Sequence, residues 1–218
     1  MKTIRRKVLT LVAACTIAPV AAAAAIPDPL VDSPLTNTRA ERTAVFAGGC
    51  FWGVQAVFEH VKGVKAVTAG YSGGSAESAN YEAVSNGTTG HAESVRITYD
   101  AAQITYGQLL KVFFSVAHDP TELNRQGPDT GTQYRSAIFY STEEEHRVAQ
   151  VYINQLDRAK VFDGPIVTMV DPFHSFYKAE SYHQDYAIHH PDDPYIVIND
   201  RPKVANLRKQ LPDLYKSK

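Results

Sequence analysis

Apolar residues recur along the chain with two periods, one typical of strands and the other of helices. The strand period is clearest in residues 94–99, where Val95, Ile97 and Tyr99 alternate with polar residues and would share one face of a sheet. The helical period is clearest in residues 51–60, directly after Cys50. The whole pattern predicts strands at residues 43–47, 64–69, 94–99, 137–140 and 166–170, with helices at residues 51–60, 105–117 and 141–160.

Two of these helices begin with a capping box, a hydroxyl residue followed three positions later by Gln or Glu. Thr105 pairs with Gln108, and Ser141 pairs with Glu144. From residue 171 onward the chain is rich in Pro, Tyr and His and has weak periodicity. We therefore expect long wrapping loops there, with a short helix near residues 204–210.

The order of elements over residues 43–140 is βαββαβ, followed by one more helix and strand. This order is the split-βαβ pattern of ferredoxin-like folds. It predicts an α+β two-layer sandwich in which helices cover one side of a mixed sheet. We assign residues 43–210 to this single domain and residues 211–218 to a C-terminal tail.

Residues 1–25 have the layout of a secretory signal peptide: a basic start, an apolar run and small residues at the end. Cleavage there would send the protein to the periplasm. Val12-Ala13-Ala14-Cys15 also resembles the lipobox of bacterial lipoproteins, in which case Cys15 would carry a lipid anchor to a membrane. Residues 26–42 are rich in Pro and polar residues and predict a flexible linker, either a tether or a wrapping arm.

Composition narrows the class of protein. With 44% hydrophobic and 21% charged residues, the 218-residue chain is globular rather than disordered. Its net charge is −1, and loss of residues 1–25 would remove four basic residues and no acidic ones, leaving −5, so we expect no nucleic-acid partner. Two cysteines cannot form a disulfide framework or a four-thiolate zinc site, and the histidines lack metal-ligand spacing, so we expect no metal.

Cys50 is the first candidate for chemistry. It lies between a predicted strand and a predicted helix, where the helix dipole and unpaired N–H groups would favour the thiolate. Gly48 and Gly49 leave it uncrowded, and the only Trp of the chain, Trp52, lies two residues away. A buried cysteine can also be a simple core residue, but this neighbourhood favours a nucleophile.

Several sequence blocks around these residues match one family in the same order. They are Gly48-Gly49-Cys50-Phe51-Trp52-Gly53, Gly70-Tyr71-Ser72-Gly73-Gly74, Asn80-Tyr81-Glu82, Gly90-His91-Ala92-Glu93, His118-Asp119-Pro120-Thr121, Gln126 to Ser136, and Ala179-Glu180-Ser181-Tyr182-His183-Gln184. Through them, residues 43–186 resemble the peptide methionine sulfoxide reductase A family.

The resemblance implies a catalytic group of four residues. Cys50 would attack the sulfur of a methionine sulfoxide and become a sulfenic acid. Glu93 would be the proton donor to the sulfoxide oxygen, which requires a desolvated carboxyl. Tyr81 and Tyr134 would donate hydroxyl hydrogen bonds to the same oxygen. Asp129 would line the site and hold substrate or the neighbouring network.

The resemblance also implies a pocket for the terminal methyl group, formed by the rings of Phe51 and Trp52. Such a pocket would accept methionine sulfoxide both free and in proteins, and it would select the S epimer. His183 would be a hydrogen-bonding residue behind the site.

Many members of the family carry further cysteines near the C-terminus that reduce the sulfenic acid. Here no cysteine follows Cys50. We therefore expect an external thiol to reduce the Cys50 sulfenic acid, either dithiothreitol or a periplasmic thioredoxin-like protein. We expect no cofactor.

Two other functions remain open from the residues alone. A cysteine hydrolase or acyltransferase would use Cys50 activated by His91 or His118. A non-enzymatic exported peptide-binding module would instead use the 12 tyrosines and Trp52 as an adhesive surface.

Overall fold

The computed structural model describes residues 26–218. The predicted signal peptide and the lipobox at Cys15 lie outside the described residues. The strands are β1 Glu41–Gly48, β2 Val64–Ser72, β3 Ala92–Asp100, β4 Arg125–Gln126, β5 Asp129–Thr130, β6 Ser136–Tyr140, β7 Met169–Pro172 and β8 Phe176–Lys178. The α-helices are α1 Phe51–Glu59, α2 Tyr81–Val84, α3 Tyr106–Val112, α4 Glu143–Arg158, α5 Tyr186–His189 and α6 Arg201–Gln210.

The main sheet has six strands in the order β7-β6-β1-β3-β2-β8. The four strands of the βαββαβ unit are β1, β2, β3 and β6, and they are antiparallel to their neighbours within the order β6-β1-β3-β2. The added strand β7 runs parallel to β6, so the sheet is mixed. The predicted α+β ferredoxin-like fold is therefore confirmed.

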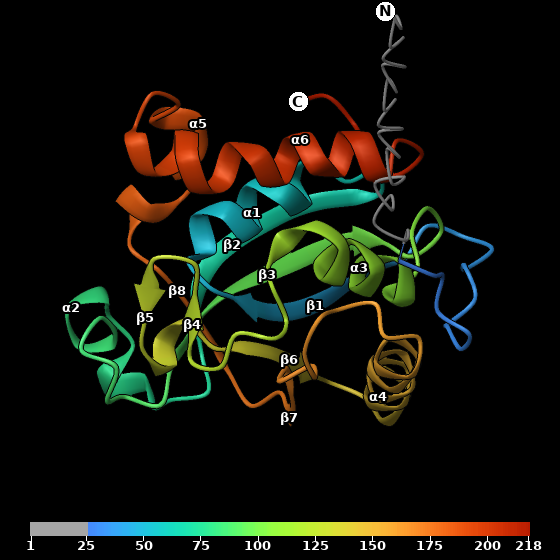
Figure 1. Cartoon of the computed structure of the whole chain (residues 1–218), viewed down its shortest axis with the longest axis horizontal. Coiled ribbons are helices and arrows are strands. Elements are labelled where there is room, and N and C mark those ends of the chain that lie inside the picture. The colour runs from blue at the N-terminus through green and yellow to red at the C-terminus, as the bar shows by residue number, and fades with distance from the viewer. Residues whose placement is uncertain (1–25) are drawn as a thin grey trace, which may run out of the picture.

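One face of the sheet carries the main core. Val95, Ile97 and Tyr99 of β3 point to this face, as the alternation predicts, and each is at most 1% exposed. Helices α1, α3 and α4 supply the other half of the same apolar cluster. Helix α6 lies over α1 on the side away from the sheet, where the two helices form the upper part of Figure 1. The core therefore holds α1, and with it the residue that precedes the helix, in a fixed place.

The opposite face of the sheet has a smaller apolar cluster covered by the loop between β7 and β8. Phe173 and Phe176 pack against Phe139 and its neighbours on this face. The guanidinium of Arg96 lies over the ring of Phe176, 4.9 Å from its centroid. These aromatics cover this face of the sheet.

The second capping box is wrong by one residue. Thr105 and Gln108 form the predicted box at α3. At α4 the N-cap is Thr142, whose hydroxyl accepts from the N–H of Glu145, while the Glu145 carboxylate accepts from the N–H of Ser141. Two adjacent hydroxyl residues followed by three glutamates allow either register, so local sequence does not choose between them.

The chain after residue 171 is more regular than predicted, because it contains β8, α5 and a long C-terminal helix. A π-helical turn at Ile196–Asp200 leads directly into α6, which therefore begins before the predicted 204–210. The fifth predicted strand also shifts, from 166–170 to Met169–Pro172. It starts late because Val167 donates its N–H to the carbonyl of Pro120 instead of joining the sheet.

The segment before β1 lies along the domain and is held by hydrogen bonds. The Asp32 carboxylate accepts from the hydroxyl of Thr105 and from the N–H of Gly107 at 2.8 Å, so it caps the start of α3 from outside. Tyr152 of α4 donates to the carbonyl of Pro27 at 2.7 Å. These contacts hold residues 27–32 against α3 and α4.

Within residues 26–218, no helix is both long and apolar enough to span a membrane.

Candidate active site

Cys50 lies at the turn between β1 and α1. Gly49 has a φ of +87°, and a Cβ there would come within 2.5 Å of the Gln126 side chain, so only glycine fits the turn. Cys50 is the N-cap of α1, a free cysteine, and 8% exposed. The strand-to-helix position predicted for Cys50 is therefore correct.

Glu93 is held beside Cys50 by the start of the same helix. It is the second residue of β3, where it is 3% exposed and pairs in register with Tyr71 of β2. One oxygen of its carboxyl group accepts a hydrogen bond of 3.1 Å from the N–H of Phe51, the residue after Cys50. Burial raises the pKa of Glu93 to about 8, against the lowering effect of that N–H. Glu93 is therefore a neutral acid at pH 7.

The charge state of Cys50 differs from the sequence-based expectation. Burial, followed by the nearby carboxylates of Glu93 and Asp200, raises the pKa of Cys50 well above its ordinary value. The N–H of Trp52 at the helix start works in the other direction but is outweighed. The resting residue is a thiol rather than a thiolate, because removal from water penalises the ion more than the helix end stabilises it.

Tyr81 and Tyr134 come from separate segments and share this electrostatic environment. Tyr81 begins the short helix α2, and Tyr134 ends the turn Thr132–Tyr134. Burial is the largest cause that raises the pKa of both hydroxyls. The negative charge of ionised Glu93 is the second largest cause, and Cys50 raises both pKa values by a smaller amount. Both therefore remain protonated donors near neutral pH.

Asp129 lies on the small β4-β5 hairpin, where Tyr195 donates its hydroxyl to the Asp129 carboxylate. Burial raises the pKa of Tyr195. Asp129 also adds to the negative field at Glu93 and Tyr134. The structure therefore brings Asp129 into the same group, on the side formed by the C-terminal segment.

Trp52 is fixed in place on two sides. Its ring stacks on Tyr186 with centroids 3.7 Å apart and planes 8° apart, and Tyr195 meets it edge-on at 5.9 Å. Its Nε1–H donates to Nδ1 of His183 at 3.2 Å. His183 is 1% exposed, and burial lowers its pKa, so the neutral ring accepts this bond. His183 therefore sets the orientation of the Trp52 ring.

Phe51 is placed differently from Trp52. It is 1% exposed, and its ring packs near Tyr71 at 5.9 Å and His183 at 5.0 Å. Trp52 is only half-buried. Of the two predicted pocket rings, Trp52 therefore has surface free for contact, while Phe51 packs in the core against His183, which also contacts Trp52.

The histidines that a cysteine hydrolase would need are engaged elsewhere. His118 contacts the hydroxyl of Ser136 at 2.7 Å and the carbonyl of Phe113 at 3.1 Å through its two ring nitrogens. His91 contacts the N–H of Gly74 and the carbonyl of Ser75. Burial lowers the pKa of His118 to about 3. Neither ring has a nitrogen free to take a proton from the Cys50 thiol.

Four further residues at the site were not singled out from the sequence. They are Glu180, Tyr186, Tyr195 and Asp200. Glu180 belongs to a matched sequence block, which was a usable signal. The other three lie in the segment of weak periodicity, where nothing local marks them.

Within residues 26–218, no group of three or more His, Cys, Asp or Glu side chains is arranged to hold a metal ion.

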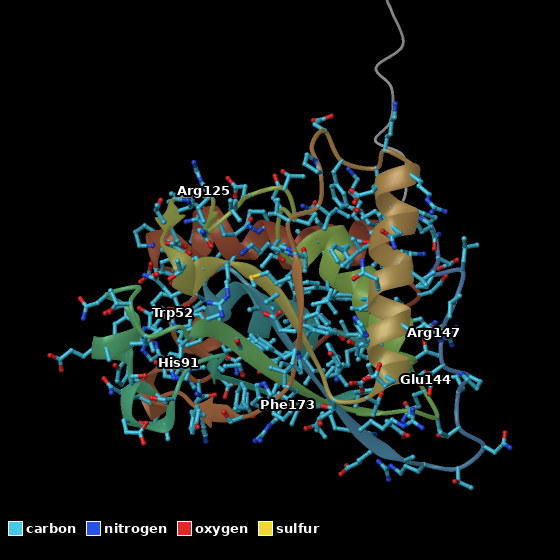
Figure 2. The ribbon with its side chains drawn as sticks, turned by 90° about the horizontal axis from the view of Figure 1, so that it is seen from below. Trp52, His91, Arg125, Glu144, Arg147 and Phe173 are labelled. Atoms are coloured by element: carbon cyan, nitrogen blue, oxygen red, sulfur yellow. The ribbon has the colours of Figure 1, made fainter. Side chains whose placement is uncertain are left out.

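Figure 2 shows Trp52 and His91 at the end of the molecule opposite Glu144 and Arg147 of α4. A buried thiol at a helix start, beside a neutral carboxyl and tyrosine hydroxyls, is an arrangement that suits a cysteine enzyme whose reaction includes proton transfer.

Comparisons with known proteins give the family. A family model described as peptide methionine sulfoxide reductase matches residues 42–214, and the chain belongs to this family. It is 60% identical to peptide methionine sulfoxide reductase MsrA 2 of Mesorhizobium japonicum, over 81% of this chain and 90% of that protein. It is 55% identical to MsrA 2 of Synechocystis sp., over 88% and 91%. Among solved structures, methionine sulfoxide reductase A of Corynebacterium diphtheriae superposes with a TM-score of 0.62 and 32% identity, covering 71% of this chain and 77% of that one.

Proposed function

We propose that this chain reduces the S epimer of methionine sulfoxide, both free and in proteins, with Cys50 as nucleophile. Membership of the family supports the reaction. The observation that carries the assignment of roles is the Glu93 carboxyl, buried, neutral at pH 7 and hydrogen-bonded to the N–H next to Cys50. A sulfoxide oxygen leaves sulfur only with a proton, and Glu93 is the group able to deliver one.

The reaction balances within this group of residues. The Cys50 sulfur attacks the sulfoxide sulfur, while Glu93 gives its proton to the sulfoxide oxygen. The attack forms a bond between the two sulfurs. This bond and the S–O bond of the substrate then break as the oxygen passes to Cys50 as a sulfenic acid, and the methionine thioether is released. The proton lost by the Cys50 thiol returns Glu93 to its neutral form. Tyr81 and Tyr134 donate hydrogen bonds to the oxygen as its negative charge grows.

Trp52 provides the wall of the methyl pocket. Because its ring is held by Tyr186 and His183, the methyl site has a fixed position relative to Cys50. With the oxygen site also fixed, only one configuration at sulfur places methyl and oxygen correctly. This selects an epimer, and the rest of the substrate remains outside the pocket, so a free amino acid and a protein are both accepted.

The sulfenic acid is reduced by a thiol from another molecule, because no cysteine follows Cys50 in this chain. An external thiol attacks the Cys50 sulfur, and its proton passes to the sulfenic oxygen, which leaves as water while a mixed disulfide forms. A second thiol of the reductant then releases Cys50. Dithiothreitol or a thioredoxin-like protein supplies both thiols. The layout of residues 1–25 supports a periplasmic location, with a lipid anchor at Cys15 as the alternative.

A single-turnover assay without reductant tests the proposal. Equal amounts of enzyme and a peptide with S-configured methionine sulfoxide should yield one methionine per enzyme. Mass spectrometry should find one added oxygen on Cys50 and no disulfide. The R epimer is the matched control and should not react. A burst of methionine that survives in Cys50→Ser would contradict the mechanism, and turnover of esters without reductant would favour a hydrolase.

A further inference from the structure

Glu180 links two tyrosines of the site region through both of its carboxylate oxygens. One oxygen accepts the backbone N–H of Tyr81 at 2.9 Å, and the other accepts the hydroxyl of Tyr71 at 2.8 Å. We propose that Glu180 is a positioning residue that holds the Tyr81 hydroxyl at the sulfoxide-oxygen site. The proposal rests on the role of Tyr81 in the proposed function.

Tyr81 needs an external support because its helix is very short. Helix α2 has four residues, Tyr81–Val84, and a helix of one turn has little stability of its own. The Asn80 side chain caps it by accepting from the N–H of Ala83. The N–H of Tyr81 lies in the first turn, where no carbonyl of the helix can accept it. Glu180, 99 residues away in sequence, is the acceptor.

Glu180 is itself fixed to the sheet. Tyr71, its second partner, is 0% exposed and lies in β2 opposite Glu93 of β3. The segment that carries Glu180 is bound to β2 on both sides. Ala179 donates its N–H to the carbonyl of Ala69, and the Gln184 amide bonds both the N–H and the carbonyl of Ala69, each at 3.0 Å.

These contacts form a continuous connection from the proton donor to Tyr81. Glu93 pairs with Tyr71 across the sheet, Tyr71 bonds Glu180, and Glu180 bonds Tyr81. The position of Tyr81 relative to Glu93 is thereby set by the sheet and not by the loop around α2. This matters because a transition-state hydrogen bond is effective only when its donor is already in place.

Glu180 acts here as a carboxylate. Partial burial opposes its charge, but the hydrogen bonds from the N–H of Tyr81 and from the hydroxyl of Tyr71 outweigh burial and lower its pKa. It therefore accepts both bonds throughout the neutral range. A glutamine at this position could still accept from Tyr81 through its oxygen and donate to the Tyr71 hydroxyl through its nitrogen.

A double-mutant cycle with Tyr81 tests the inference. Glu180→Ala should lower kcat by about tenfold with little change in KM, since it disturbs an interaction made mainly in the transition state. Glu180→Gln should recover most of the rate. In a Tyr81→Phe background, Glu180→Ala should cause no further loss, because the hydroxyl that it positions is absent.

Glu82→Ala is the matched control, since Glu82 is an exposed acid on the same short helix; its rate should equal that of the wild type. Thermal unfolding of each variant checks that the fold is retained. Equal losses from Glu180→Ala in the wild-type and Tyr81→Phe backgrounds, or no recovery in Glu180→Gln, would overturn the positioning role while leaving the reductase intact. A full rate in Tyr81→Phe would remove Tyr81 from the oxygen site, and the proposal with it.

Discussion

Relative to the wild type, Glu93→Gln should become more stable as pH rises, and it should lack the proposed proton donor. Glu93 is 3% exposed, and burial raises its pKa from 4.5 to about 8. The unfolded chain releases the proton above pH 4.5, whereas the folded protein keeps it up to about pH 8. Wild-type stability therefore falls with pH across this window, because the folded state binds more protons than the unfolded state.

The size of the effect follows from the pKa difference. Each pH unit within the window lowers the free energy of unfolding of the wild type by about 1.4 kcal/mol. At pH 7 the accumulated loss is about 3 kcal/mol. Glutamine does not ionise, and its oxygen can still accept from the N–H of Phe51. Its buried NH₂ group offsets part of the gain, by about 1–3 kcal/mol.

The assay is urea unfolding of both proteins at several pH values between 4 and 9. The free energy of Glu93→Gln minus that of the wild type should be negative near pH 4 and should rise by about 1.4 kcal/mol per pH unit up to about pH 8. Sulfoxide reduction by the variant should be about 10²–10⁴-fold slower below pH 8, as expected for loss of a general acid, and the gap should narrow above it. A stability difference that does not change with pH would refute the reasoning, because it would mean that Glu93 is ionised in the folded protein.

Three further predictions concern other groups of the fold. Alkylation of Cys50 by iodoacetamide should keep accelerating above pH 9, because burial raises the pKa of this thiol. In Glu93→Gln the dependence of the alkylation rate on pH should shift to lower pH, because the charge of Glu93 also raises the pKa of Cys50. His118→Asn should flatten the loss of stability on acidification, since burial lowers the pKa of His118 from 6.5 to about 3 and only the unfolded chain takes up the proton in that range. Gly53→Ala should lower stability by about 1–3 kcal/mol, because its Cβ would lie 2.0 Å from a carboxylate oxygen of the buried Asp200. Gly164→Ala is the control, since a Cβ there makes ordinary contacts and should leave stability unchanged.

Each of these has a contrary outcome. A plateau in the alkylation rate below pH 8 would show that the resting residue is a thiolate. Parallel acid-unfolding curves for wild type and His118→Asn would show that another group takes up the protons. Equal melting temperatures for the two glycine variants would mean that the Asp200 carboxylate moves away from α1 without loss of stability.

The sheet was predictable because its signals are local. The alternation in residues 94–99, and the glycines that end β1, act over a few positions, and the order βαββαβ then restricts the topology. The short elements α2, α5, β4, β5 and β8 are not predicted from the sequence, since each is only two to four residues long. Two of them also depend on distant partners, because α2 is held by Glu180 and β8 pairs with β2. The predicted start of the C-terminal helix is too late because its π-helical beginning has no sequence marker.

The same distinction between local signals and tertiary contacts applies to the site. By itself, the sequence determined which residues are present and in what local order: Cys50 at a helix start, Glu93 near a strand start, and no thiol after Cys50. Only the tertiary structure decided their protonation. Cys50 is a thiol and Glu93 a neutral acid because both are removed from water by segments far away in the chain, and desolvation outweighs the helix end. The structure likewise decided which side chains orient the site, since the bonds of Glu180 to Tyr81 and of His183 to Trp52 join residues 99 and 131 positions apart.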